Sequence, residues 1–288
     1  MLSDSMSRLK SLEFVRTPLC EAVGLLLLLL LLSSPRVNAI GDAGADGDFE
    51  RRDSFHFTLF QDVDLDESGG LKGSRHFEQQ VLRELEGAYD LLDSLLSLRP
   101  DRKIEVYVWD AQIFQARFAG LFRFPAAGFY GGAIHIRGDE QITRRLVRVL
   151  HHELVHAAFD SAAPRLVLPA WLNEGVAEWF EARAVGKRSL SGGERQALQR
   201  SARQGSFFSL DELSTPSFGG LGPEAAGLAY LQSYAFIDYL VETHGPRDLV
   251  QFISDVLRAR SLERASRRAY RKDLADLEDG YRQKLGLR

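Results

Sequence analysis

The stretch LVRVLHHELVHAAF, residues 146–159, combines a helical apolar pattern with three chemically active side chains. His152 and His156 are four residues apart, so in a helix they stand one turn above each other on the same face. Two imidazoles in this arrangement can bind one zinc ion, and Glu153 is placed to reach a water molecule in the open coordination position. The apolar neighbours indicate a buried helix, where such polar groups are costly unless they have a partner. A metal ion would be that partner.

The next helix expected along the chain, over Trp171–Ala184, offers a third ligand. It begins WLNEGVAE, and Glu174 follows His156 by 18 residues, enough for the chain to turn and lay a second helix beside the first. Catalytic zinc takes three protein ligands and keeps one open position, and two histidines with one glutamate are a known solution. Glu178, on the same face one turn later, can accept the second ring N–H of a liganding histidine. Asn173 could orient a ligand or cap the helix.

The segments HHELVH and WLNEGVAEWF together resemble the gluzincin zinc metallopeptidases, the clan of thermolysin and the aminopeptidase N-type enzymes. More narrowly, they resemble the peptidase-MA-like domains of secreted bacterial proteins. The resemblance is specific over about residues 140–245 and extends only at the level of fold to the rest of the chain. It implies one Zn²⁺ ion, with a general base and a carboxylate behind the ligands. The implied ligands are His152, His156 and Glu174, the implied base is Glu153, and the implied partner of a ligand is Glu178.

A tyrosine further along the chain extends the resemblance. Residues 230–240, YLQSYAFIDYL, are similar to the helix that follows the zinc site in aminopeptidase-type gluzincins, where a tyrosine hydroxyl donates to the oxyanion. The matching residue is Tyr230, and Tyr234 on the same face is the alternative stabiliser. A phenol O–H is suited to stabilising negative charge as it develops. The other interpretation is that both rings are core aromatics whose hydroxyls are satisfied.

Two motifs of related peptidases are missing from this chain, which limits the branches that it resembles. The metzincins, the other large branch with this helix, require glycine and histidine where this chain has Phe159 and Ala162, so that branch is excluded. Aminopeptidases carry Gly-x-Met-x-Asn with an acidic residue, whereas Gly132–Ile136 reads GAIHI, which argues against an aminopeptidase. The strand expected over Gly128–Ile136 could form the edge beside the cleft, where an extended substrate would pair with it. Exo- or endopeptidase action stays open.

The pattern of elements predicts an α+β fold, because strands come first and helices dominate after residue 139. We expect a small N-terminal β-sheet with helices, a zinc-site helix pair and a helical C-terminal lobe. The single domain would span 54–288, with an N-lobe over 54–159 and a C-lobe over 160–288. The expected strands are Ser54–Gln61, Lys103–Trp109 and Gly128–Ile136. The expected helices are His76–Leu98, a helix capped by Asp139 that runs to about Phe159, Trp171–Ala184, 194–203, 224–243, 246–258 and 262–287.

The first 39 residues have the layout of a secretory signal peptide. Arg8, Lys10 and Arg16 precede the apolar block Ala22–Leu32, and Val37-Asn38-Ala39 offers a cleavage site. This block is too short to span a membrane as a helix, which takes about 20 residues. We therefore expect export to the periplasm or the exterior with no stable membrane span after cleavage. An uncleaved membrane anchor is the alternative. Residues 40–53 are expected to be a flexible leader.

Composition limits the remaining possibilities. The chain has 288 residues, 45% of them apolar, with 36 Lys+Arg against 40 Asp+Glu, so bulk positive charge does not hold it to nucleic acid. The single cysteine excludes a disulfide scaffold and a cysteine-based zinc site. The acidic run Asp62–Asp66 resembles the start of a calcium loop but lacks its glycine and final glutamate, so a solvated acidic turn is the better interpretation.

The sequence thus predicts an exported zinc metallopeptidase that acts on a peptide or protein substrate. The alternative is a catalytically inactive gluzincin-fold module for binding or assembly. The presence of Glu153 argues against that alternative, because a degraded enzyme usually loses its base first. His151 points away from the ligand face by about 100° and is not expected to be a ligand. The oligomeric state is left open.

Overall fold

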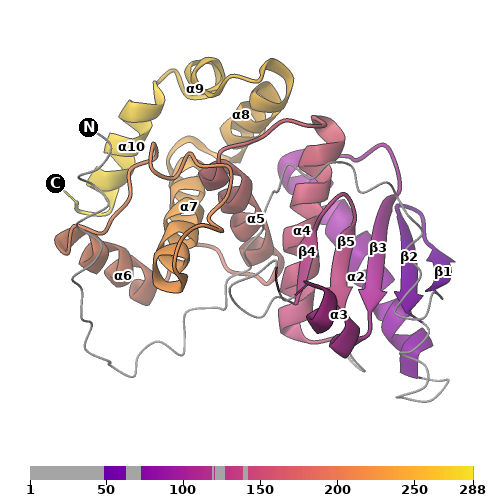
Figure 1. Cartoon of the computed structure of the whole chain (residues 1–288). Coiled ribbons are helices and arrows are strands. Elements are labelled where there is room, and N and C mark those ends of the chain that lie inside the picture. Colours follow the sequence, from indigo (N-terminus) through magenta and orange to yellow (C-terminus); the bar gives the residue numbers. More distant parts are fainter. Residues whose placement is uncertain (1–48, 63–72, 119, 121–126, 139–141, 288) are drawn as a thin grey trace.

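The computed structural model describes residues 49–62, 73–118, 120, 127–138 and 142–287. It has a mixed sheet at one end and a mass of helices at the other, which confirms the α+β class (Figure 1). The expected signal peptide (1–39), most of the expected leader and most of the acidic run Asp62–Asp66 lie outside the described residues. Among the residues that are described, no helix has the length and apolar character needed to cross a membrane.

The sheet has five strands in the order β1-β2-β3-β5-β4. The strands are β1 (Phe49–Asp53), β2 (Phe57–Asp62), β3 (Ile104–Trp109), β4 (Gly128–Tyr130) and β5 (Ile134–Arg137). β2, β3 and β5 run parallel, and the outer strands β1 and β4 are antiparallel to their neighbours. Strand β4 is thus an edge strand.

Strand alternation gives the sheet two different faces. One face carries aliphatic and aromatic side chains that are buried against helices α2 (Gly73–Leu96) and α4 (Arg144–Ala162). The other carries a row of rings in register across four strands: Phe60, Tyr107, His135 and Phe129. Neighbouring rings in this row stack with centroids 4.8, 5.2 and 4.8 Å apart.

Three expectations for the N-lobe are wrong in detail. Phe49–Asp53, expected in the flexible leader, is strand β1, because its backbone pairs with β2. The single strand expected over Gly128–Ile136 is the hairpin β4–β5, whose turn contains Gly132 at φ +93°, a conformation that favours glycine. Helix α3 (Ala111–Phe118), capped by Asp110, was not expected.

The cap of the long helix also differs. Thr143 caps α4, because its Oγ1 accepts a hydrogen bond from the Leu146 N–H at 3.1 Å, whereas Asp139 lies outside the described residues. The helix then continues to Ala162, close to the expected end.

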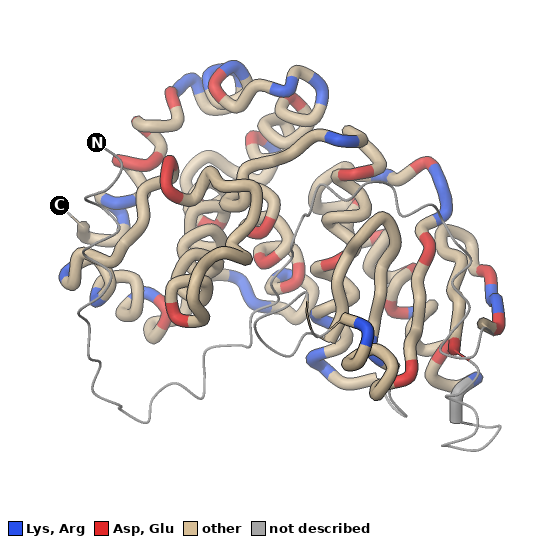
Figure 2. Tube along the Cα trace, in the orientation of Figure 1, with Lys and Arg blue, Asp and Glu red and all other residues tan. Residues whose placement is uncertain are grey.

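The remaining helices form the C-terminal part of the chain. They are α5 (Ala170–Ala184), α6 (Gly192–Arg203), α7 (Pro223–His244), α8 (Pro246–Ala259), α9 (Leu262–Tyr270) and α10 (Leu274–Lys284). Helices α5 and α7 pack closely at Gly175, since a Cβ added there would lie 2.8 Å from the Ser233 carbonyl oxygen. Charged residues of both signs are scattered over the described part of the chain (Figure 2).

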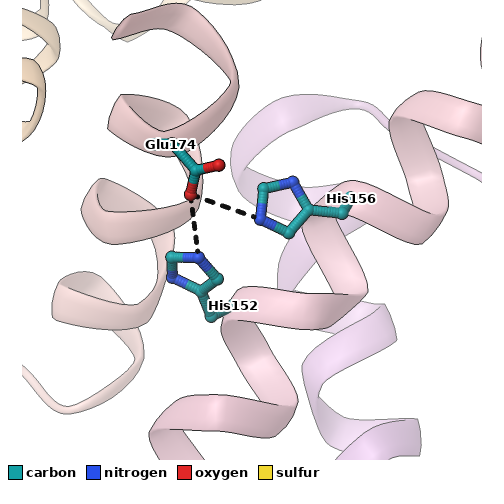
Figure 3. A group of neighbouring side chains, drawn as sticks. All are labelled: His152, His156 and Glu174. Carbon is teal, nitrogen blue, oxygen red and sulfur yellow. Dashed lines mark hydrogen bonds and ion pairs between the residues drawn. The ribbon is translucent and has the colours of Figure 1, made fainter. Parts of the chain in front are cut away.

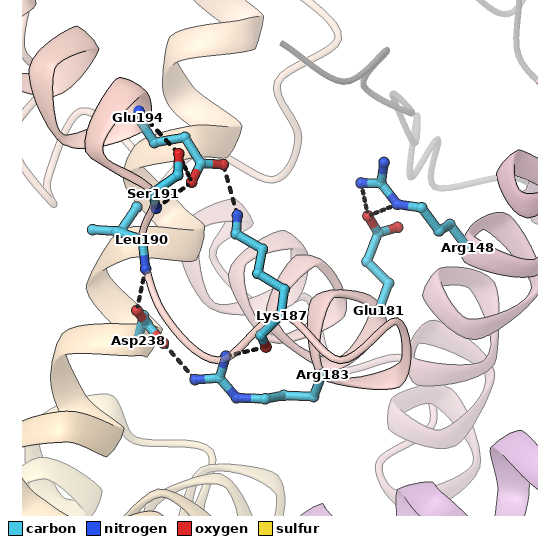
Figure 4. Close-up of polar contacts among 8 residues, drawn as sticks. All are labelled: Arg148, Glu181, Arg183, Lys187, Leu190, Ser191, Glu194 and Asp238. Carbon is cyan, nitrogen blue, oxygen red and sulfur yellow. Dashed lines mark hydrogen bonds and ion pairs between the residues drawn. The ribbon is translucent and has the colours of Figure 1, made fainter. Parts of the chain in front are cut away.

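A polar network fixes the end of α5 to its neighbours (Figure 4). Arg183 donates to Asp238 on α7 at 2.5 Å and to the Lys187 carbonyl oxygen at 2.7 Å. Asp238 also accepts from the Leu190 N–H at 3.2 Å, and Lys187 bonds Glu194 of α6 at 2.6 Å. The helix that carries Glu174 is thereby held on both α6 and α7.

Candidate metal centre

Helices α4 and α5 bring three possible metal ligands together (Figure 3). The loop between them reverses the chain, so the two helices run antiparallel, with Asn173 beside His156 and Glu181 beside His152. Glu174 Oε2 lies 3.3 Å from His152 Nε2 and 3.6 Å from His156 Nε2. The ligand atoms of the three residues all lie within 4.8 Å of one another.

These separations fit a tetrahedral cation. Two donors that each lie 2.0–2.1 Å from a tetrahedral zinc ion are about 3.3–3.4 Å apart, close to the two distances from Glu174. His156 Nε2 is buried and has no hydrogen-bond partner among the described residues, which is costly without a cation. The donor set of two imidazoles and one carboxylate is that of a catalytic zinc site.

The outer ring nitrogens of the histidines face separate acceptors. His156 Nδ1 lies 3.0 Å from Asn173 Oδ1, so the ring donates there and leaves Nε2 bare toward Glu174. His152 Nδ1 lies 3.5 Å from Glu181 Oε2. Each imidazole therefore presents Nε2 to the same point and has Nδ1 next to an oxygen, as zinc-ligating histidines do.

Glu181, and not the expected Glu178, is the carboxylate beside His152. Seven residues after Glu174, Glu181 lies two turns along the same face, where the antiparallel α4 presents His152 and Arg148. Glu178 makes no hydrogen bond or ion pair with any described residue. It lies close enough to Glu181 that burial, together with this second carboxylate, raises its pKa to about 8.

Arg148 completes the arrangement behind His152. Its Nε donates to Glu181 Oε1 at 2.9 Å, and a terminal guanidinium nitrogen contacts the same oxygen (Figure 4). Both contacts are made to Oε1, so Oε2 faces His152. Neither residue was predicted from the sequence. The spacings that identify them are one helical turn from Arg148 to His152 and two turns from Glu174 to Glu181.

Burial sets the protonation of the ligands. Burial opposes the charged form of His152, yet the neighbouring carboxylates of Glu174 and Glu181 outweigh it and raise the pKa of His152 well above its usual value. Burial, with the neighbouring His152, lowers the pKa of His156 far below its usual value. Burial also raises the pKa of Glu174. Burial removes solvation from all three groups, and a shared cation would compensate for that energetic cost.

Glu153, the predicted general base, lies next to His152 on α4. Neither carboxylate oxygen makes a hydrogen bond of normal geometry with a described residue, and the side chain is 0% exposed. Burial raises its pKa to about 8, while the charge of His152 and the backbone N–H of Tyr130 act in the opposite direction. Because the backbone N–H of Tyr130 is close enough to lower the pKa of Glu153, the unpaired side of edge strand β4 faces this carboxylate.

The four central side chains are almost completely enclosed. His152 and Glu153 are 0% exposed, Glu174 is 1% exposed and His156 is 4% exposed. A substrate can therefore reach the carboxylate of Glu153 only if the surroundings open.

The two tyrosines occupy different environments on α7. Tyr230 is fully buried, with its ring edge-on to Phe218 at 5.2 Å. Tyr234 lies under the Lys187 ammonium, 4.1 Å from its ring centroid, and burial followed by the charge of Asp238 raises its pKa. The roles of Tyr230 and of the alternative Tyr234 at the ligands stay predictions.

His151 takes no part in the cluster. It is buried, and its Nδ1 donates to the Val147 carbonyl oxygen at 2.7 Å within the same helix. This backbone bond points the ring away from the ligand face.

Comparison with known families agrees with this geometry. A model described as the Peptidase MA superfamily matches residues 95–286, which include both α4 and α5. The chain therefore belongs to the Peptidase MA superfamily and has a peptidase-like fold with a possible metal-binding group. A comparison with curated proteins found no match.

Proposed function

We propose that the chain is an exported zinc-dependent metallopeptidase that hydrolyses peptide bonds. The proposal rests on the convergence of two Nε2 atoms and one carboxylate oxygen, at separations suited to a tetrahedral cation. Membership of the Peptidase MA superfamily supports a peptidase-like hydrolase. Export rests on the signal-like residues 1–39 alone.

Each residue of the site has a separate role in the proposed hydrolysis. His152, His156 and Glu174 hold the ion, which when bound supplies Lewis acidity. Glu153 takes a proton from the attacking water and returns it to the leaving amine, and its raised pKa suits both steps. Tyr230 donates to the developing oxyanion. Asn173 and Glu181 hold the two imidazoles in position.

Replacement of the base tests this mechanism. We expect Glu153→Gln to keep the bound zinc, because the ligands are unchanged, and to lower the rate of peptide hydrolysis by about 10²–10⁴-fold. Zinc content and cleavage of a mixed peptide substrate, with and without a chelator, would be measured side by side. If the variant cleaves as fast as the parent, Glu153 is not the base.

One observation favours a second candidate function. The near-complete burial of Glu153 and the three ligands is compatible with a gluzincin-fold module that retains a metal but serves for binding or assembly. A parent chain that binds one zinc ion and cleaves no peptide in the same assay would support this alternative.

A further inference from the structure

A cavity lies beside the catalytic face of α4, outside the metal cluster. Its volume is about 430 Å³, within the ~300–1,000 Å³ of typical ligand pockets. The segment before β3, the end of edge strand β4 and the last turns of α4 form its walls. Its lining includes Asp101, Glu105, Tyr130, Ala157 and Asp160.

The cavity lies along the same face of α4 as the proposed general base, Glu153. Asp160 follows Glu153 by seven residues, so it lies on the same face of α4, about 10 Å further along the helix axis. Strand β4 follows this face, because Gly128 lies against Val149 near its start. Tyr130 lies at the end of this strand. Its backbone N–H is close enough to Glu153 to lower the pKa of that carboxyl, and its hydroxyl donates to Asp160 Oδ2 at 2.9 Å. One residue thus connects the base to the cavity.

The carboxylates of the cavity are held by neutral donors. Asp160 accepts from the Tyr130 hydroxyl, Asp101 from the Ser161 hydroxyl at 3.4 Å, and Glu105 from the Tyr107 hydroxyl at 3.3 Å. Within the described part of the chain, none of the three carboxylates forms an ion pair.

The basic residues of the lining do not balance these three charges. Lys103 is paired with Asp53 at 3.0 Å, outside the cavity, which leaves Arg102 against three carboxylates. The lining therefore has an excess of negative charge at the end of the edge strand.

We propose that this cavity is a substrate subsite for a cationic group, the side chain of a lysine or arginine close to the bond that is cleaved. The inference rests on the proposed peptidase function. An extended peptide paired with β4 would cross Glu153 and place one side chain beyond Tyr130. A guanidinium or ammonium there would meet the Asp160 carboxylate directly, and charge-assisted hydrogen bonds of this kind are about twice as strong as neutral ones.

The test begins with the zinc-loaded full chain and a mixed peptide library. Cleavage sites read by mass spectrometry should show lysine or arginine enriched at one fixed position beside the cleaved bond. Two fluorogenic peptides that differ only at this position, arginine against methionine, then give a selectivity ratio from their kcat/KM values. We expect the ratio to fall at least tenfold in Asp160→Asn, mainly through KM for the arginine peptide.

Two further variants keep the result interpretable. Asp101→Asn changes a second, exposed carboxylate of the cavity and should lower the same ratio, should Asp160→Asn fold poorly. Asp279→Asn makes the same charge change on the exposed surface of α10 and should leave the ratio unaltered. Hydrolysis without a basic preference, or a ratio unaffected by both cavity variants, would overturn the subsite alone. Absence of any cleavage by the zinc-loaded parent would instead overturn the peptidase function on which the subsite rests.

Discussion

At the scale of single residues, the site depends on which nitrogen of each imidazole faces the centre. Asn173 holds His156 by Nδ1, and Glu181 lies beside Nδ1 of His152, so both Nε2 atoms converge on Glu174. Outer contacts of this kind fix the tautomer and the ring orientation of metal ligands. The buried carboxylate of Glu181 beside His152 is thus placed to position that ring, and Arg148 holds the carboxylate by a hydrogen bond.

The distinction between two glutamates on α5 is directly testable. We expect Glu181→Gln to weaken zinc binding by about 10–100-fold, because the amide no longer accepts strongly from His152 Nδ1. Glu178→Gln is the matched control and should change the affinity less, since Glu178 makes no hydrogen bond with a described residue. Competition with a zinc chelator measures both constants. A larger loss in Glu178→Gln than in Glu181→Gln would contradict the assignment.

At the scale of elements, the site depends on the close contact between α5 and its neighbours. Gly175 follows Glu174 directly and lies against α7, where a Cβ would come within 2.8 Å of the Ser233 carbonyl oxygen and 3.0 Å of Ile237 Cγ1. The helix can therefore approach α7 only with glycine at this position. The network of Arg183 and Asp238 holds the far end of the same helix (Figure 4).

Thermal denaturation can compare two glycines. Gly175→Ala should lower the free energy of unfolding by about 1–3 kcal/mol, because the added methyl group overpacks the contact with α7. Gly87→Ala is the control, since Gly87 lies exposed within α2 with no atom within 4 Å of an added Cβ. That substitution should raise stability by up to about 1 kcal/mol through helix propensity. Equal effects at both sites would contradict the packing.

A second element-scale prediction concerns the row of rings on the sheet. His135 Nδ1 accepts from the Trp109 indole N–H at 3.1 Å, which requires a neutral imidazole. Burial, and then the charge of Arg117, lowers the pKa of His135 from 6.5 to about 4. Between these values the unfolded chain binds a proton that the folded chain does not, so stability is full above pH 6.5 and is lost as the pH falls toward 4.

The contribution of His135 can be isolated by difference. Unfolding free energies of the parent and of His135→Phe, which keeps a ring in the row, would be measured between pH 7 and 4.5. The parent should lose up to about 3 kcal/mol more than the variant over this range. Parallel pH profiles for the two proteins would show that His135 does not titrate in this way.

The sequence predicted most helices and the three candidate ligands, but it did not predict the β4–β5 hairpin or the contact of Glu181 with His152. The helices other than α3 were predicted because their apolar residues recur with a helical period, although the helical stretch expected over 262–287 is divided into α9 and α10. His152, His156 and Glu174 followed from spacing within and between two of the helices. The hairpin β4–β5 was read as one strand, because the apolar pattern continues across the turn at Gly132. Glu178 was predicted and Glu181 was missed, since spacing along α5 alone does not show that α4 runs antiparallel beside it. Those relations arise only from tertiary packing.

At the scale of the whole molecule, the candidate metal site joins α4, the helix next to the sheet, to α5, the helix next to α7. Two ligands come from α4, which packs on β4, and one comes from α5, so a bound ion would tie the two parts of the fold together (Figure 1). A ligand that binds only the folded state stabilises it by mass action, by about 4 kcal/mol at a free concentration 1,000 times its Kd. Removal of zinc by a chelator should therefore lower the Tm.

The most direct measurement is the zinc content of the purified chain and of His156→Ala, with the Tm of each recorded before and after chelation. We expect one zinc ion per chain in the parent, loss of that ion in the variant, and a drop in Tm on chelation in the parent alone. A parent chain that binds no zinc when the ion is supplied, or a variant that binds it as well as the parent, would contradict the claim that His152, His156 and Glu174 form a metal site.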